Sequence, residues 1–138
     1  YSGDNFGICY REFDTAAGPF MLPTTTPVQF DPDAMHHTID RLIAYGPRRI
    51  FQTHFGPVDQ IERLGRDLHA NVVELVRIAR RHAHAPQRSQ RIAEDMFRWF
   101  STRLDAHGYT GDLARRHALL DDDVRLNTSG LEVWLNRH

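Results

Sequence analysis

Residues 61 to 79 carry an apolar stripe with helical spacing, and this pattern constrains the fold more than any other feature of the chain. The stripe lasts for about six turns at the usual helical repeat. Its members are Ile61, Leu64, Leu68, Val72, Leu75, Val76 and Ala79. The stripe predicts one long helix, which Pro86 closes.

The rest of the second half is also predicted to be helical. Apolar residues with helical spacing predict a helix that ends near Gly108, and a further helix over residues 112 to 120. We expect the acidic run at residues 121 to 123 to form a solvated turn. Asn127 or Thr128 would then cap a last short helix.

The first half has a different character. Residues 1 to 30 are rich in Gly, Pro, Thr and aromatic residues without a helical period, which predicts a long shaped loop. We expect this loop to be ordered only against another segment or chain, because Phe6, Phe13 and Phe20 need burial. Asp31 and Pro32 have the N-cap and first-position chemistry of a helix.

That helix should end at residues 46 and 47, Gly-Pro, and a short strand is predicted over residues 48 to 53. His54 would then lie at the carboxyl end of the strand, the edge where ligands collect in open α/β sheets. The predicted class is therefore α/β, with two short strands and one helix followed by a helical extension.

Composition limits the classes of partner. The 138 residues suffice for one compact domain, and a formal net charge of -1 gives no attraction to nucleic acid or to an anionic membrane. No apolar run is long enough to span a bilayer, so we predict a soluble, cytoplasmic protein without nucleic-acid or membrane partners. Cys9 is the only cysteine, and its apolar neighbours predict a buried core residue.

Two short motifs carry candidate chemistry: Ser2-Gly3-Asp4 and Thr53-His54-Phe55-Gly56. Taken singly, Asp4 could cap a turn and His54 could be a hydrogen-bonded core histidine. Together, with a loop, a helix and a strand between them, they resemble the later motifs of the metallo-β-lactamase superfamily. A carboxylate can bridge two metal ions and a neutral imidazole suits a terminal position on zinc or iron.

The resemblance implies that residues 1 to 57 are the C-terminal part of a metallo-β-lactamase αββα sandwich. Residues 58 to 138 would be a helical extension like that of glyoxalase-II-like members. It implies Asp4 as a bridging ligand and His54 as a terminal ligand of a two-zinc centre, with iron or manganese as other metals. The implied activity is hydrolysis of an ester, thioester, lactone or related bond of a small-molecule substrate.

The family's His-x-His-x-Asp-His cluster does not occur in this sequence. We therefore expect this chain alone to be inactive, and the missing half of the fold or a second chain, such as a homodimer partner, to supply the other ligands. Tyr10 and Arg11, in the loop after Asp4, correspond to the place where family members contact substrate; an ordinary loop salt bridge is the alternative.

Other histidines receive simpler interpretations. At least one of His36 and His37 should be exposed, and His82 and His84 should belong to a solvated helix end. Two other functions remain open. One is an iron-dependent dioxygenase acting on a persulfide, within the same superfamily, and the other is a non-catalytic helical binding module.

Overall fold

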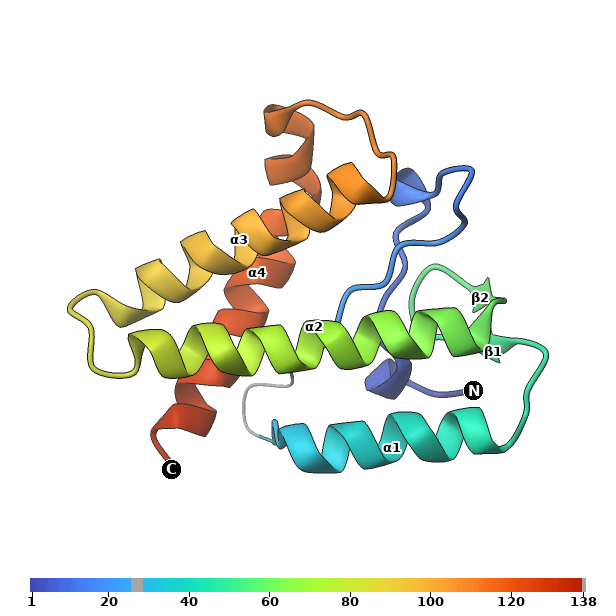
Figure 1. Ribbon diagram of the computed structural model, residues 1–138, viewed down its shortest axis with the longest axis horizontal. Helices are drawn as coiled ribbons and strands as arrows, with labels where there is room; N and C mark the ends of the chain where they lie inside the picture. The colour runs from blue at the N-terminus through green and yellow to red at the C-terminus, as the bar shows by residue number, and fades with distance from the viewer. Residues whose placement is uncertain (26–28, 138) are drawn as a thin grey trace. The chain divides into compact units, whose positions relative to one another are not determined.

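The computed structural model describes residues 1 to 25 and 29 to 137. Within them the chain is mixed α/β and mostly helical, with four α-helices and one two-stranded antiparallel sheet (Figure 1). The helices are α1 (Pro32–Ala44), α2 (Ile61–His82), α3 (Arg88–Ala106) and α4 (Leu113–Leu135). The strands are β1 (Ile50–Phe51) and β2 (Pro57–Val58), and two short 3-10 turns, η1 (Asp4–Phe6) and η2 (Arg11–Phe13), precede them.

The chain divides into two compact units. Unit 1 contains residues 1 to 24 and 31 to 73, and unit 2 contains residues 25 to 30 and 74 to 138, so the division falls within α2. The boundary predicted at residues 57 and 58 is of another kind, between a metallo-β-lactamase-like part and its extension, and it stays a prediction.

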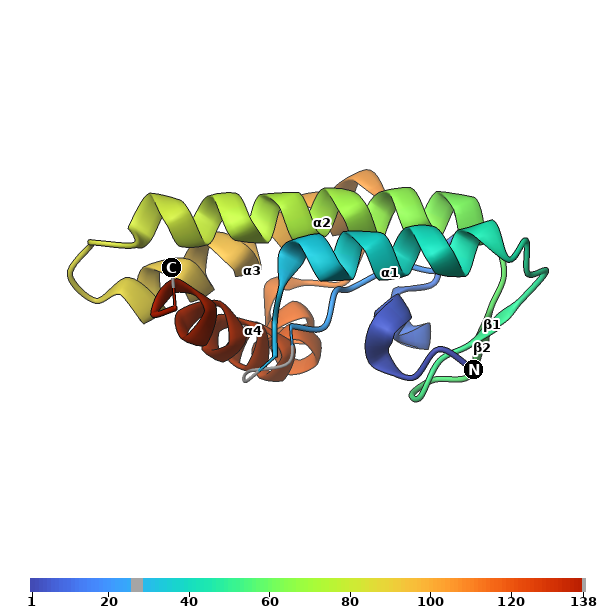
Figure 2. The same ribbon diagram turned by 90° about the horizontal axis from the view of Figure 1, so that it is seen from below.

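The helix α1 begins as its sequence predicts. The Asp31 carboxylate accepts a hydrogen bond from the Ala34 amide at 2.8 Å, and Pro32 occupies the first helical position. After α1 the backbone turns at Gly46, whose φ of 59° lies in the left-handed region. In both views α1 lies antiparallel to the first part of α2 (Figures 1 and 2).

Strand pairing joins three segments of unit 1. The strands β1 and β2 are antiparallel, with Ile50 opposite Val58 and Phe51 opposite Pro57. The N-terminal residues extend this sheet on the other side, because Gly3 forms a parallel bridge with Gln52 and the Ser2 amide donates to the Phe51 carbonyl at 3.0 Å. The carboxyl ends of two parallel segments therefore meet at one edge.

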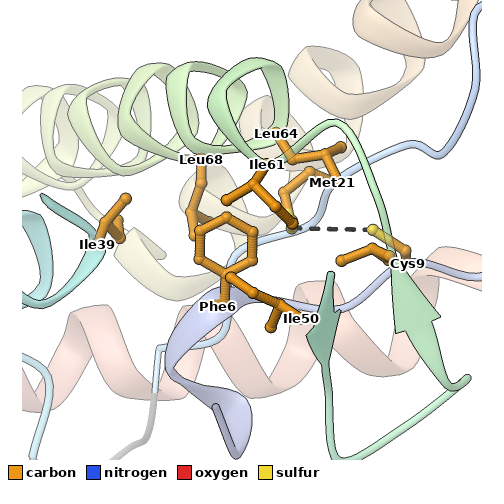
Figure 3. Close-up of a cluster of buried hydrophobic side chains, with 9 residues drawn as sticks. Phe6, Cys9, Met21, Ile39, Ile50, Ile61, Leu64 and Leu68 are labelled. Atoms are coloured by element: carbon orange, nitrogen blue, oxygen red, sulfur yellow. Dashed lines mark hydrogen bonds between the residues drawn. The ribbon is translucent and has the colours of Figure 1, made fainter. Parts of the chain in front are cut away.

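The core of unit 1 is formed by the loop, α1, the strands and the first part of α2 (Figure 3). Its buried members are Phe6, Cys9, Met21, Ile39, Ile50, Val58, Ile61, Leu64 and Leu68. The expected burial of Cys9 is confirmed, and burial raises the pKa of its thiol to about 12.

The long N-terminal loop corrects one expectation. Phe6 and Phe13 are fully buried and Phe20 is 6% exposed within this single chain, so the loop does not need another chain to bury these rings. The reason lies in local packing: Phe13 and Phe20 form an edge-to-face pair with ring centroids 5.7 Å apart, and Phe6 joins the unit 1 core.

In unit 2, α4 corrects a second expectation. It is one continuous helix through residues 121 to 123 and through Asn127 and Thr128, where a turn and a new N-cap were expected. Asp112 is its N-cap and accepts from the Arg115 amide at 2.9 Å. The Asn127 side chain instead accepts two hydrogen bonds from Thr25, at 2.7 Å from the amide and 2.8 Å from the hydroxyl.

An ion pair between Arg88 and Glu132 links α3 and α4 within unit 2. None of the helices, in the part of the chain that the structure describes, has the length and apolar character that crossing a membrane requires.

Candidate functional site

Asp4 and His54 lie next to each other at the carboxyl edge of the paired segments. Asp4 follows Gly3, the residue bridged to Gln52, and His54 follows Gln52 by two residues. The distance from Asp4 Oδ1 to His54 Nε2 is 4.0 Å. Two ligands of one metal centre must have their polar atoms within roughly 5 Å of each other, and the implied ligands Asp4 and His54 meet this requirement.

The pair is open to solvent. The Asp4 side chain is 54% exposed and the His54 side chain 56% exposed, so a solute can reach both donor atoms. A carboxylate and an imidazole at this separation form a loose, water-screened contact, which contributes little to stability. The contact therefore does little to stabilise the fold.

The backbone before Asp4 requires glycine. Gly3 has φ 59° and ψ -141°, a conformation that side chains with a Cβ rarely adopt. The Thr24 hydroxyl donates to the Asp4 carbonyl at 2.7 Å and fixes the same turn from the other side. Together, the conformation of Gly3 and this hydrogen bond set where the Asp4 side chain leaves the backbone.

Gln52 ties the Asp4 segment to the His54 segment. Its buried side-chain amide donates to the carbonyls of Phe6 and Gly7, at 2.7 and 2.9 Å. Its Oε1 has no hydrogen-bond partner among the described residues. Because Gln52 directly follows β1 and lies two residues before His54, these bonds connect the backbone that carries Asp4 to the backbone that carries His54.

The loop that carries His54 is strained and is clamped by Arg11. Phe55 has a φ of 65°, a left-handed conformation that costs a non-glycine residue about 1–2 kcal/mol. The Arg11 guanidinium donates to the Phe55 carbonyl at 3.0 Å and to the Pro57 carbonyl at 2.6 Å. The Tyr10 ring packs on the Phe55 ring, with centroids 4.4 Å apart.

Tyr10 and Arg11 therefore lie beside the candidate pair, with contacts that support the loop. Arg11 also lies 3.6 Å from the Asp14 carboxylate, the loop salt bridge that the sequence left open. Their contact with a substrate stays a prediction.

The candidate metal site consists of Asp4 and His54 alone among the described residues. Within residues 1 to 25 and 29 to 137, no three or more His, Cys, Asp or Glu side chains are grouped so as to hold a metal ion. Two protein ligands give weak binding, because a stable site needs three or four that are held by supporting hydrogen bonds.

The remaining histidines largely follow the simpler interpretations. His37 and His84 are exposed, as expected for each pair. The expectation for His82 is wrong, because its side chain is only 13% exposed and its Nε2 contacts the Asp95 carboxylate at 2.8 Å. His36 lies 2.6 Å from His69, which the sequence reasoning did not single out.

Comparisons of the chain with protein-family models, with curated proteins and with solved structures found no match.

Proposed function

We propose that this chain is the C-terminal portion of a metal-dependent hydrolase of the metallo-β-lactamase type, acting on an ester, thioester, lactone or related bond. The observation that supports the proposal is the 4.0 Å approach of Asp4 to His54, two residues fifty positions apart, at a solvent-exposed sheet edge. A purely structural pair would gain little from meeting there.

The donor set fits a divalent metal in kind but not in number. The Asp4 carboxylate has two oxygens that can bridge two ions, and the His54 imidazole suits a terminal position on zinc, iron or manganese. The other ligands would come from a further segment of the protein or from a second chain. When bound, the metal would lower the pKa of a water molecule and polarise the substrate oxygen.

The chain's own contribution is positioning. Gly3 and Thr24 fix the Asp4 turn, Gln52 joins the two ligand-bearing segments, and Arg11 holds the strained loop after His54. The exposed Phe55 and the half-buried Tyr10 add aromatic surface beside the pair, which would favour a substrate with an apolar part.

The proposal is tested by titrating the 138-residue chain with Co²⁺ and following the histidine ring signals by NMR. Co²⁺ accepts both imidazole and carboxylate ligands, and its unpaired electrons broaden signals close to it. We expect selective broadening of the His54 ring at sub-stoichiometric Co²⁺, and its loss in Asp4→Asn. His37→Gln is the matched control, because His37 is an exposed histidine on α1 and not a member of the pair.

Broadening of His37 and His84 to the same extent as His54 would overturn the proposal. A second test uses the protein with its further segment or partner chain: metal-dependent hydrolysis should be lost in Asp4→Asn and His54→Ala. Bound iron with oxygen consumption in place of hydrolysis would support the persulfide dioxygenase alternative instead.

The non-catalytic helical module remains the second candidate, favoured by the absence of a third ligand near the pair among the described residues. It predicts that Asp4→Asn and His54→Ala leave every metal-dependent property of the intact protein unchanged.

A further inference from the structure

Three side chains form a hydrogen-bonded chain between α1 and α2 in unit 1. His36 and Asp40 are one turn apart on α1, and His69 lies on α2. His36 Nδ1 is 2.6 Å from His69 Nδ1, and His69 Nε2 is 2.9 Å from Asp40 Oδ1. The His69 side chain is 27% exposed, so it is largely withdrawn from water, whereas that of Asp40 is 69% exposed.

The two imidazoles meet edge to edge. Their planes differ by 16° and their centroids are 4.9 Å apart. The centroid distance equals the 2.6 Å contact plus the distance from each ring centre to its own Nδ1. Both nitrogens therefore lie on the line that joins the ring centres. The lone-pair directions of the two Nδ1 atoms therefore point at each other.

This head-on geometry selects a proton as the group between the rings. A metal ion needs about 2.0–2.1 Å to each nitrogen, so on this line it would push the rings roughly 4 Å apart at their nitrogens. Hydrogen bonds from a nitrogen donor span about 2.7–3.2 Å, so a proton on one Nδ1, donated to the other, needs a separation much closer to the observed 2.6 Å than a metal ion does.

These two hydrogen bonds fix how many protons the three side chains can hold. The Asp40 carboxylate only accepts, so His69 must carry a proton on Nε2. In the neutral state His36 Nδ1–H donates to the bare Nδ1 of His69. With one proton more, imidazolium His69 donates to Asp40 on one side and to His36 on the other, and both hydrogen bonds remain.

A second added proton cannot be accommodated. Both Nδ1 atoms would then carry hydrogens pointing at each other at 2.6 Å, and two imidazolium charges would lie side by side with Asp40 as the nearest balancing group. The hydrogen bond between the helices would be replaced by repulsion.

We propose that His36, His69 and Asp40 form a proton-binding site that joins α1 to α2, which tolerates one added proton and is broken by a second. The proposal does not depend on the hydrolase function, because none of the three residues belongs to the Asp4 and His54 pair.

The electrostatic surroundings agree with this limit. Burial and the neighbouring His69 lower the pKa of His36 from its ordinary value of 6.5. The charged groups that act on His36 are His69 from α2 and Asp33 and Asp40 from its own helix; the two carboxylates raise the pKa and do not outweigh the first two effects.

The sign of the pH effect follows from the lowered pKa. The pKa of His36 is 6.5 in the unfolded chain and lower in the folded chain, so at a pH between these two values only the unfolded chain binds a proton at His36. The stability contributed by neutral His36 is therefore present above pH 6.5 and is lost as the pH falls through the lower folded pKa.

The test is an NMR titration of the full chain, following the ring nitrogens of His36 and His69 from neutral to acid pH with EDTA present. We expect the two rings to titrate in coupled steps, each ring responding to both steps, with one Nδ1 protonated and the other bare near pH 8. In His69→Gln, His36 should show one step, shifted up from its wild-type midpoint. The neighbouring variant His37→Gln should leave both rings unchanged.

Independent single steps for the two rings, with the His36 midpoint unmoved in His69→Gln, would overturn the proposal. So would bare Nδ1 atoms on both rings near pH 8, or a change of either ring when micromolar Zn²⁺ replaces EDTA. Circular dichroism of each variant at pH 8 checks that α1 and α2 are intact before the titration is interpreted.

Discussion

The replacement of Arg11 by methionine tests how the loop that carries His54 is held. Methionine keeps an unbranched apolar stem of similar reach and removes the donors that reach the carbonyls of Phe55 and Pro57. These carbonyls come just after His54, and Phe55 holds the unfavourable left-handed conformation. The variant therefore removes support where the backbone most needs it.

The expected loss follows from the contacts. A hydrogen bond from a charged donor contributes about 1.5–3 kcal/mol when well shielded. The Arg11 side chain is 44% exposed, so water replaces much of each bond, and we expect a total loss of about 1–2 kcal/mol. Arg11→Lys should recover less than half, because one ammonium lacks the planar fork that reaches two carbonyls.

Equilibrium urea unfolding measures the loss, and hydrogen exchange places it. Amides of residues 50 to 58 should exchange faster in Arg11→Met than in the wild type. The control is Arg125→Met, because Arg125 is 71% exposed and its ion pair with Asp122 is long, at 3.3 Å. An unfolding midpoint and exchange rates equal to the wild type in Arg11→Met would refute the clamp.

Three further outcomes are expected. Gly130→Ala should lower the free energy of unfolding in urea by several kcal/mol, because the new Cβ would lie 2.4 Å from the Thr25 carbonyl oxygen. This clash outweighs the roughly 1 kcal/mol helix preference of alanine. Gly65→Ala should cost less, because its Cβ meets the movable end of the Ile43 side chain. The pKa of Cys9, raised from 9.0 to about 12, predicts iodoacetamide alkylation at pH 8 on the order of a thousandfold slower in the folded than in the urea-unfolded chain, measured by mass spectrometry.

Local signals made α1, α2, α3 and the first strand predictable. Asp31 and Pro32 have the chemistry of a helix start, and the stripe that begins at Ile61 continues without interruption through α2. The approach of Asp4 to His54 was predicted from the resemblance to the metallo-β-lactamase motifs, because only that resemblance placed the two residues at one metal centre.

The course of α4 was not predictable by the same rules. Leu120, Val124, Leu131 and Trp134 are buried with helical spacing, but the stripe is interrupted in sequence by Asn127, a residue that usually ends or caps helices. Asn127 is buried because Thr25, more than a hundred residues away, supplies its hydrogen bonds. In this helix a long-range contact outweighs the local preference.

The acidic run in α4 shows the same competition at its exposed members Asp121 and Asp122, whereas Asp123 is buried. Asp121 lies one turn after His117, with 2.8 Å between their polar atoms, and Asp122 lies 3.3 Å from Arg125. Such pairs at three and four residues apart each stabilise a helix by about 0.2–0.5 kcal/mol. The run therefore continues the helix because its partners have the correct spacing, which a count of aspartates alone does not show.

The two histidine sites differ in what the sequence could have shown. His54 follows a strand, so its position at an edge is local information. His36 and His69 each come one residue after a stripe residue, Met35 and Leu68, so each lies at the border of an apolar face. Two such borders meet when the helices pack, which makes a histidine pair across α1 and α2 a reasonable inference from helical phase. What phase cannot give is the head-on alignment of the two Nδ1 atoms, and this alignment is the feature that favours a shared proton over a metal ion.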